Sequence, residues 1–314
     1  SGGSVGAFFR FETGDMKQDG VFRAMNRTSK GNLYILAAAL LWSTGGLIMK
    51  AVPFNGIVVN FFRTVFAFLF FAAMRRSFRI KINKTILLGT FCFFASTTFY
   101  ACSNKMTTAA NAIVLQYTAP MFVLAMQCVR ERTLPKRRDV ILLTAAFFGM
   151  ILFFCDQLDP GKMLGNIFGV LAGVFFAAMF VVNQMPGASN ADANMLGFLM
   201  TIVIGLPFVV TEDLHFTPQI AAALVFLGTI QIGMAYYMFS KGVSLTPPVN
   251  ASLISVLEAV LNPLWVFLSL GERPGNFALL GAVFLIGAVV MNIAAEHRQA
   301  VLTDVEKKLS HKKV

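Results

Sequence analysis

The chain has 314 residues, of which 57% are hydrophobic and 13% are charged, and its formal net charge is +11. Soluble domains carry about 25% charged residues, so this composition indicates a membrane protein; its hydrophobicity also excludes a disordered chain. The 4 Cys are too few for a disulfide scaffold of this length, and no nucleic-acid partner is expected, because the basic residues form short clusters between apolar runs.

Ten apolar runs are long enough to cross a lipid bilayer as helices, which requires about 20 mostly apolar residues each. The runs are continuously apolar, whereas the strands of a membrane barrel alternate between apolar and polar residues. The sequence therefore predicts an all-α polytopic membrane protein with ten transmembrane helices. The predicted spans lie near residues 32–50, 56–74, 84–104, 107–128, 138–155, 164–184, 192–210, 219–240, 246–268 and 274–295.

The positions of the basic residues predict the orientation of the chain, because cytoplasmic loops hold Lys and Arg in excess. Most of the 26 Lys and Arg lie in the two tails and in the loops after the second, fourth and eighth spans. We therefore expect an integral protein of a bacterial cytoplasmic membrane with both termini in the cytoplasm. Its tails would be residues 1–30, of which those before Met16 are expected to originate from cloning, and the charged residues 297–314.

Two halves of the sequence resemble each other. Residues 31–34, Gly-Asn-Leu-Tyr, open the first span, and residues 165–168, Gly-Asn-Ile-Phe, open the sixth. The stretches 107–132 and 246–273 each begin with Thr, continue with Asn-Ala and close on Glu-Arg. The sequence thus predicts two five-helix repeats, at 31–155 and 164–296. An odd number of spans per repeat inverts the second repeat in the membrane, an arrangement that allows alternating access to a site at the midplane.

These repeats resemble the EamA family of the drug/metabolite transporter (DMT) superfamily. The residues that carry the resemblance are Trp42-Ser43-Thr44, Arg63, the run Gln116-Tyr117-Thr118-Ala119-Pro120, and Leu257-Glu258-Ala259-Val260 followed by Leu270-Gly271-Glu272-Arg273. Members of this family commonly have Pro after the Glu of the ninth span, where this chain has Ala259. The resemblance implies a ten-helix carrier, and it does not define the substrate, because family members move amino acids, amines, nucleotide-derived metabolites and drugs.

Two formal charges, Arg63 and Glu258, lie well within the predicted spans. A charged side chain at the centre of a membrane helix costs a few kcal/mol, so each is a candidate functional residue. The repeat alignment places Met200 opposite Arg63 and Ala119 opposite Glu258, so neither charge has a counterpart in the other half. The two could form a structural ion pair, or they could face a shared cavity.

Polar and aromatic residues near these charges are candidate wall groups of a binding site. Ser255, Glu258 and Asn262 are spaced three and four apart, which places them on one face of a helix. Trp42, Gln231 and Tyr236 are further candidates, although such residues also bridge helices in membrane bundles. No cofactor or metal is expected, because the Cys residues lack a CxxC motif and the spans contain no His.

The leading functional prediction is a secondary transporter and not an enzyme. It would move a small polar metabolite, with an amino acid or an organic amine favoured, by alternating access. Burial favours the protonated form of a carboxyl group, so Glu258 could exchange a proton for a cationic group of the substrate. The alternative is a flippase for a lipid or a lipid-linked sugar, which would need a basic patch for the headgroup, and Arg63 is the only internal cation.

Overall fold

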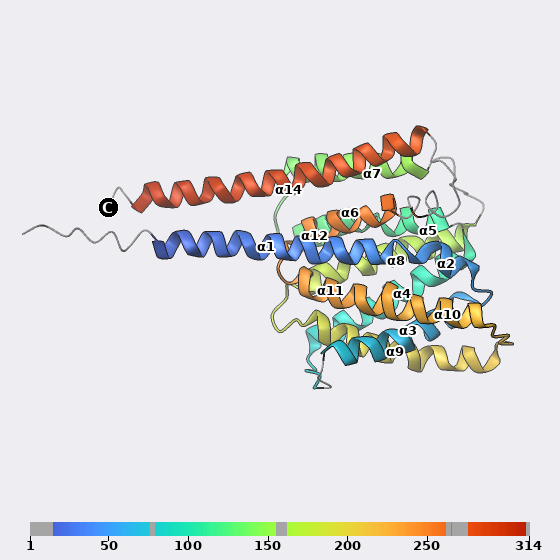
Figure 1. The fold of residues 1–314 in the computed structure, drawn as a ribbon. Coiled ribbons are helices and arrows are strands. Elements are labelled where there is room, and N and C mark those ends of the chain that lie inside the picture. Colours follow the sequence, from blue (N-terminus) through green and yellow to red (C-terminus); the bar gives the residue numbers. More distant parts are fainter. Residues whose placement is uncertain are drawn as a thin grey trace, which may run out of the picture.

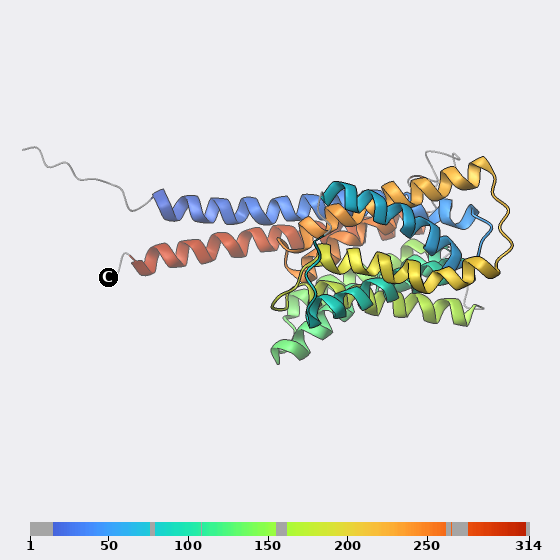
Figure 2. The ribbon, with the colours of Figure 1, turned by 90° about the horizontal axis from the view of Figure 1, so that it is seen from below.

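The computed structural model describes residues 15–75, 79–107, 109–154, 162–261, 265 and 276–311. These residues form a bundle of helices that run side by side (Figures 1 and 2), and no strand occurs in the described part of the chain. The elements are α1 (Asp15–Trp42), α2 (Gly45–Ala51), α3 (Gly56–Arg75), α4 (Lys84–Met106), α5 (Ala109–Gln116), α6 (Ala119–Glu131), α7 (Arg137–Phe154), α8 (Met163–Val182), α9 (Asn190–Thr211), α10 (Pro218–Phe226), η2 (Leu227–Met234), α11 (Ala235–Val243), α12 (Pro248–Ser255) and α14 (Asn276–His311).

In the parts of the predicted spans that the structure describes, each coincides with helical structure, and the all-α membrane fold is confirmed. Within the described residues, six helices have the length and apolar composition needed to cross a membrane, and two shorter apolar helices cover 248–261 and 279–295. The tails contain more helix than their charge indicates, since α1 begins at Asp15 and α14 continues to His311.

Several spans that the sequence predicts as single helices are interrupted. The first is α1 and α2, which are separated at Ser43 and Thr44, and the fourth is α5 and α6, which are separated at Tyr117 and Thr118. The eighth runs from α10 through η2, a π-helical segment, into α11. In the ninth, a turn at Val256 separates α12 from a helical segment at 257–261. Hydropathy averaged over a span does not reveal these breaks, because apolar residues lie on both sides of each of them.

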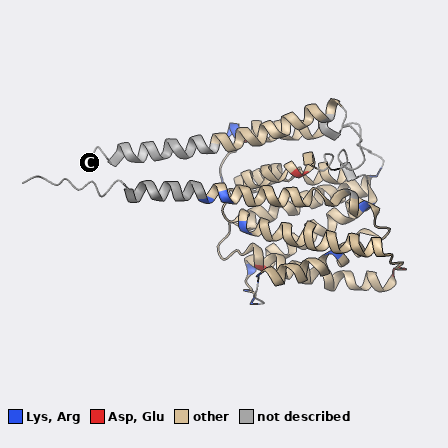
Figure 3. Ribbon diagram, viewed as in Figure 1, with Lys and Arg blue, Asp and Glu red and all other residues tan. Residues whose placement is uncertain are grey.

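Contacts between loops agree with the predicted alternation of the chain across the membrane. The Arg75 side chain pairs with Asp192 at 2.5 Å, which joins the loop after the second span to the start of the seventh. The amide of Asn55, in the loop after the first span, donates to the carboxylate of Glu212, in the loop after the seventh. Each contact joins segments that the prediction places on the same side. Figure 3 shows the charged residues gathered mainly at the two ends of the bundle.

Candidate functional site

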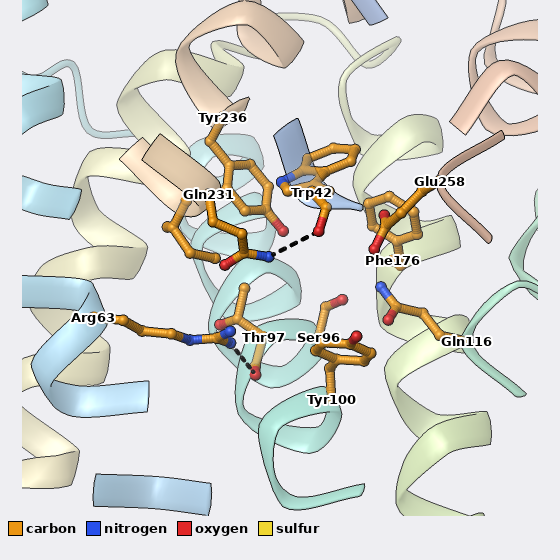
Figure 4. A pocket seen from close by; sticks show the side chains of 11 residues that line it. Trp42, Arg63, Ser96, Thr97, Tyr100, Gln116, Phe176, Gln231, Tyr236 and Glu258 are labelled. Atoms are coloured by element: carbon orange, nitrogen blue, oxygen red, sulfur yellow. Dashed lines mark hydrogen bonds between the residues drawn. The ribbon is translucent and has the colours of Figure 1, made fainter. Parts of the chain in front are cut away.

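An internal cavity lies in the middle of the bundle, and its volume is about 30 Å³. This volume accommodates about two water molecules, so the cavity is contracted in this conformation. Helices from both repeats form its wall, and their side chains converge on it (Figure 4). The lining residues are Trp42, Arg63, Ser96, Thr97, Tyr100, Gln116, Phe176, Gln231, Ile232, Tyr236 and Glu258.

The helix interruptions converge on this cavity. Trp42 is the last residue of α1, Gln116 is the last residue of α5, Gln231 lies within η2, and Glu258 follows the turn at Val256. Discontinuous helices expose backbone groups and often build the substrate sites of membrane carriers. Irregular backbone is tolerated at membrane depth where it lines such a cavity, so the interruptions mark this cavity as the candidate site.

Arg63, on α3, has a side chain that is 1% exposed and held by three neighbours. Its Nε donates to Asn60 Oδ1 at 2.9 Å, one terminal nitrogen donates to Met49 Sδ at 3.2 Å, and the other donates to the carbonyl oxygen of Thr97 at 3.3 Å. Asn60 lies one turn before Arg63, so the helix itself supplies the first of these contacts. Among the described residues, Arg63 has no carboxylate partner that would neutralise its positive charge.

Glu258 is 7% exposed and lies on the other side of the cavity from Arg63 (Figure 4). Tyr117, at the break between α5 and α6, donates its hydroxyl hydrogen to Glu258 Oε2. The sequence left open whether Arg63 and Glu258 form an ion pair; within the described residues they do not, although both line the same cavity. A carboxyl group and a guanidinium group therefore face one cavity without pairing with each other.

Trp42 and Gln231 contribute polar atoms that lack partners. The Trp42 ring packs against Tyr236 at a centroid distance of 5.1 Å and against Phe176 at 5.8 Å. Gln231 Nε2 donates to the carbonyl oxygen of Trp42 at 3.4 Å, across the gap after α1. In the part of the chain that the structure describes, neither Trp42 Nε1 nor Gln231 Oε1 has a hydrogen-bond partner, although both atoms are buried. Among the described residues, these two side chains thus offer the cavity a donor, Trp42 Nε1, and an acceptor, Gln231 Oε1.

The structure gathers five of the seven predicted site residues at the cavity: Trp42, Arg63, Gln231, Tyr236 and Glu258. Ser255 is buried outside the lining set, and its hydroxyl donates to the carbonyl oxygen of Ala251 at 2.9 Å. The prediction of one shared face assumed a continuous helix, whereas the turn at Val256 separates Ser255 from Glu258. Asn262 lies outside the described residues.

Sequence reasoning missed Ser96, Thr97, Phe176 and Ile232 as lining residues and Tyr117 as the partner of Glu258. Phe176 and Ile232 resemble ordinary core residues, and Ser and Thr commonly bond to their own helix, as Thr97 does with the carbonyl oxygen of Phe93. The repeat could have predicted Tyr117 as a neighbour of Glu258, since Tyr117 lies two residues before Ala119, the repeat counterpart of Glu258. If the fourth span packs against the ninth, its counterpart in the other repeat, Tyr117 and Glu258 come close to each other.

A helical membrane bundle whose interrupted helices surround a polar internal cavity is typical of polytopic carriers. The sequence pattern of the EamA-like transporter family matches the chain twice, over residues 29–155 and 163–294. The chain therefore belongs to the EamA-like transporter family, and it is a membrane transporter for which a small-molecule substrate is implied.

Known proteins with related sequences are also transporters. The uncharacterized inner membrane transporter YicL of Salmonella typhimurium is 27% identical over 306 residues, covering 88% of this chain and 99% of its own. The S-adenosylmethionine uptake transporter of Rickettsia bellii is 24% identical over 222 residues, covering 68% of this chain and 73% of its own. A solved crystal structure shares the fold with a TM-score of 0.71 at 16% identity, covering 83% of this chain and 96% of that one.

Proposed function

We propose that the protein is a secondary active transporter that moves a small polar metabolite with a cationic group, an amino acid or an organic amine, across the cytoplasmic membrane by alternating access. The observation that carries this proposal is the pair Arg63 and Glu258, which face one buried cavity and do not neutralise each other. Buried charges are costly unless they are compensated, so a solute with complementary charges is the natural partner of this site.

The lining residues divide into complementary roles in this proposal. Arg63 would bind a substrate carboxylate, because a guanidinium forms paired hydrogen bonds with carboxylates. Glu258 would bind the ammonium group, and Trp42 and Tyr236 would contact it through their ring faces. The free Trp42 Nε1–H and Gln231 Oε1 would bond to polar groups on the rest of the solute.

Proton coupling through Glu258 follows from the same geometry. With the cavity empty of substrate, Glu258 would carry a proton, because burial favours the neutral carboxyl group. Arrival of a cation would displace that proton, and loss of the cation would restore it. Tyr117 would hold the carboxyl group in place during this exchange, since it contacts one oxygen and leaves the other available.

The contracted cavity must widen to admit a solute of this class, as alternating access requires. The relative named as an S-adenosylmethionine uptake transporter is consistent with the proposed class, because S-adenosylmethionine is an amino-acid derivative with both carboxylate and cationic groups. The distribution of basic residues supports cytoplasmic termini, with residues 1–30 and 297–314 as tails around the repeats 31–155 and 164–296.

The first test is a thermal-stability screen of purified protein against amino acids, amines, nucleosides and phosphorylated sugars, because a ligand of the native state raises its stability. Stabilisation by amino acids or amines, followed by protein-dependent uptake of the same compound into proteoliposomes, is the expected result. Stabilisation by phosphorylated sugars or nucleosides alone would contradict the substrate class. Scrambling of labelled lipid without uptake of any solute would indicate a flippase instead.

The second test addresses the coupling role of Glu258. Glu258→Gln is expected to abolish the dependence of uptake on an imposed pH gradient, since the amide cannot exchange a proton. Asp213→Asn is the matched control, because the Asp213 side chain is 89% exposed in the loop between α9 and α10 and does not line the cavity. Wild-type uptake with unchanged pH dependence in the Glu258 variant would exclude coupling through this residue.

A further inference from the structure

Two polar contacts that are related by the internal repeat lie at opposite ends of the bundle. Asn166, at the start of α8, accepts hydrogen bonds at Oδ1 from Thr107 Oγ1 and from Asn111 Nδ2, both at 2.9 Å. The corresponding residue in the first repeat is Asn32, whose Oδ1 accepts a hydrogen bond from Thr246 Oγ1 at 3.2 Å. We call the group Thr107, Asn111 and Asn166 the outer latch and the repeat-related group Thr246, Asn250 and Asn32 the inner latch; a latch is closed when Asn111 bonds to Asn166, or when Asn250 bonds to Asn32.

The backbone packing at the two latches is also related. A Cβ added to Gly165 would lie 2.9 Å from Cβ of Thr107, and one added to Gly31 would lie 2.8 Å from Cβ of Leu245, next to Thr246. Lys50 Nζ, in the last turn of α2, donates to the carbonyl oxygen of Thr107 at 2.7 Å. The outer latch therefore lies at the end of the first span that is remote from Asn32.

The two latches differ in the bonds that one repeat-related residue makes, which is Asn111 in the first repeat and Asn250 in the second. At the outer latch, Asn111 completes the cluster by bonding to Asn166. Its repeat counterpart, Asn250, does not bond to Asn32; its Oδ1 accepts from Asn292 Nδ2 of α14 at 2.5 Å instead. Asn250 is 3% exposed, and its Nδ2 has no partner among the described residues. A buried amide without a partner is unfavourable, so Asn250 retains an unused donor for which Asn32 is the repeat-related acceptor.

Asn292 accounts for this difference between the halves. By the repeat offset that aligns Glu131 with Glu272, the residue of the first repeat at this position is Ile151, which cannot accept or donate a hydrogen bond. The side chain of Ile151 therefore cannot hold Asn111 in the way that the Asn292 side chain of α14 holds Asn250.

A groove with room for about 320 Å³ of solute adjoins the inner latch. Asn250 lines it together with Gln127 and Cys128 of α6, and with charged residues of both signs that include Glu131 and Lys136. The groove is about ten times larger than the central cavity, and α12 connects the two, because Asn250 lies near its start and Glu258 lies three residues beyond its end.

We propose that Asn111–Asn166 and Asn250–Asn32 are latches that close alternately, and that the groove at Asn250 is the inner entrance of the transport pathway, held open in this structure by the bond from Asn292 to Asn250. The proposal rests on transport by alternating access. Breaking the Asn292 bond lets Asn250 join Asn32 and Thr246, as Asn111 joins Asn166 and Thr107. Motion of Asn250 is then carried along α12 to the turn at Val256 and to Glu258.

The native Cys128 is a reporter for this movement, because it is a free thiol in the wall of the groove. With Cys92, Cys102 and Cys155 replaced by Ala, the rate at which a maleimide alkylates Cys128 in the detergent-solubilised protein measures how open the groove is. Asn292→Leu is expected to slow alkylation by about five-fold or more, the lower range of typical conformational couplings. The neighbouring exposed variant Met291→Leu is the control and is expected to label at the parent rate.

The double variant Asn292→Leu with Asn32→Ala distinguishes closure of the inner latch from a general disturbance of the fold. It removes the acceptor of the closed inner latch, so alkylation of Cys128 is expected to return close to the parent rate. Unchanged or faster labelling of Asn292→Leu overturns the proposal, and so does slow labelling that Asn32→Ala fails to reverse. If Asn292→Leu does not yield folded protein by gel filtration, Asn292→Ala replaces it with the same expectations.

Failure of the proposed function would have a different signature. It would appear as wild-type protein without ligand-dependent stabilisation or uptake, whereas the alkylation rates require no substrate. The two proposals can therefore be overturned separately.

Discussion

Arg63 combines burial with an unneutralised charge, and this combination separates a binding role from a structural one. Asn60, Met49 and Thr97 engage three of the five N–H donors of its guanidinium. A structural arginine in a membrane helix pairs with a carboxylate or with backbone carbonyls. Arg63 bonds to one carbonyl, that of Thr97, and the described Glu258, which lines the same cavity, contacts Tyr117 instead. Two of the N–H donors of Arg63 thus make no bond to a described residue.

Arg63→Met is therefore expected to weaken binding of a carboxylate-bearing ligand by roughly 10- to 100-fold, since hydrogen bonds to charged groups contribute about 1.5–3 kcal/mol. The measurement is isothermal titration with the amino acid identified by the stability screen. The matching amine that lacks the carboxylate serves as the control, and its affinity should change little. An equal loss for both ligands would mean that Arg63 maintains the cavity and does not bind the carboxylate.

Two substitutions of Trp42 test the packing of its ring and the hydrogen bonding of its Nε1–H separately. Trp42→Phe keeps an aromatic ring near Tyr236 and Phe239 but removes Nε1–H, which has no partner among the described residues. Its thermal stability is expected to stay close to that of the wild type, while ligand affinity falls about 3- to 10-fold, corresponding to about 1 kcal/mol for one hydrogen bond. Trp42→Ala, which loses the ring contacts, should destabilise the protein by about 3–5 kcal/mol. Unchanged affinity in Trp42→Phe would exclude Nε1 from the site.

At the scale of elements, hydropathy predicts where helices lie but not where they break. The runs around Trp42, Gln116 and Glu258 are apolar on both sides of each break, so the sequence predicts continuous spans there. At the first break, the hydroxyls of Ser43 and Thr44 bond to carbonyl oxygens of α1, and Gln231 Nε2 bonds to the carbonyl oxygen of Trp42; hydropathy reports neither kind of contact. Arg63 and Glu258 could be found from the sequence because charges are rare in spans; Tyr117 required the packing of one repeat against the other.

The π-helical segment η2 packs closely on α3, and Gly228 makes that approach possible. A Cβ at Gly228 would lie 2.5 Å from the carbonyl oxygen of Arg63, which is backbone and cannot move aside alone. Gly228→Ala is therefore expected to separate the two helices and to destabilise the protein by about 1–3 kcal/mol, as overpacking commonly does. Thermal unfolding in detergent measures the change.

Gly287→Ala is the matched control for this prediction. Gly287 lies on α14, and an added Cβ would meet no atom within 4 Å among the described residues. Replacing a helical Gly by Ala in open space should leave stability unchanged or raise it by up to about 1 kcal/mol. Equal effects of the two substitutions would contradict a specific close contact between η2 and α3.

For the whole molecule, the excess of positive charge predicts how the bundle is oriented in the membrane. The two family matches at 29–155 and 163–294 correspond to the two predicted halves, and the odd number of predicted spans in each half predicts that the same local sequence faces opposite sides of the membrane. The related contacts of Asn166 with Thr107 and of Asn32 with Thr246 occur at opposite ends of the bundle, in agreement with that inversion. Basic residues are concentrated at one end, which gives the duplicated fold a single preferred orientation.

Orientation in the membrane can be tested with single cysteines in a variant that lacks the four native ones. Leu134 is 91% exposed and lies in the loop between α6 and α7, which is rich in Lys and Arg. The side chain of His215 is 86% exposed and lies in the loop between α9 and α10, which the prediction places on the opposite side. Because basic loops stay in the cytoplasm, a membrane-impermeant maleimide added to intact cells should label His215→Cys at once and Leu134→Cys only after permeabilisation. The reverse pattern would invert the molecule, and would turn the groove beside Asn250 into an outward-facing entrance.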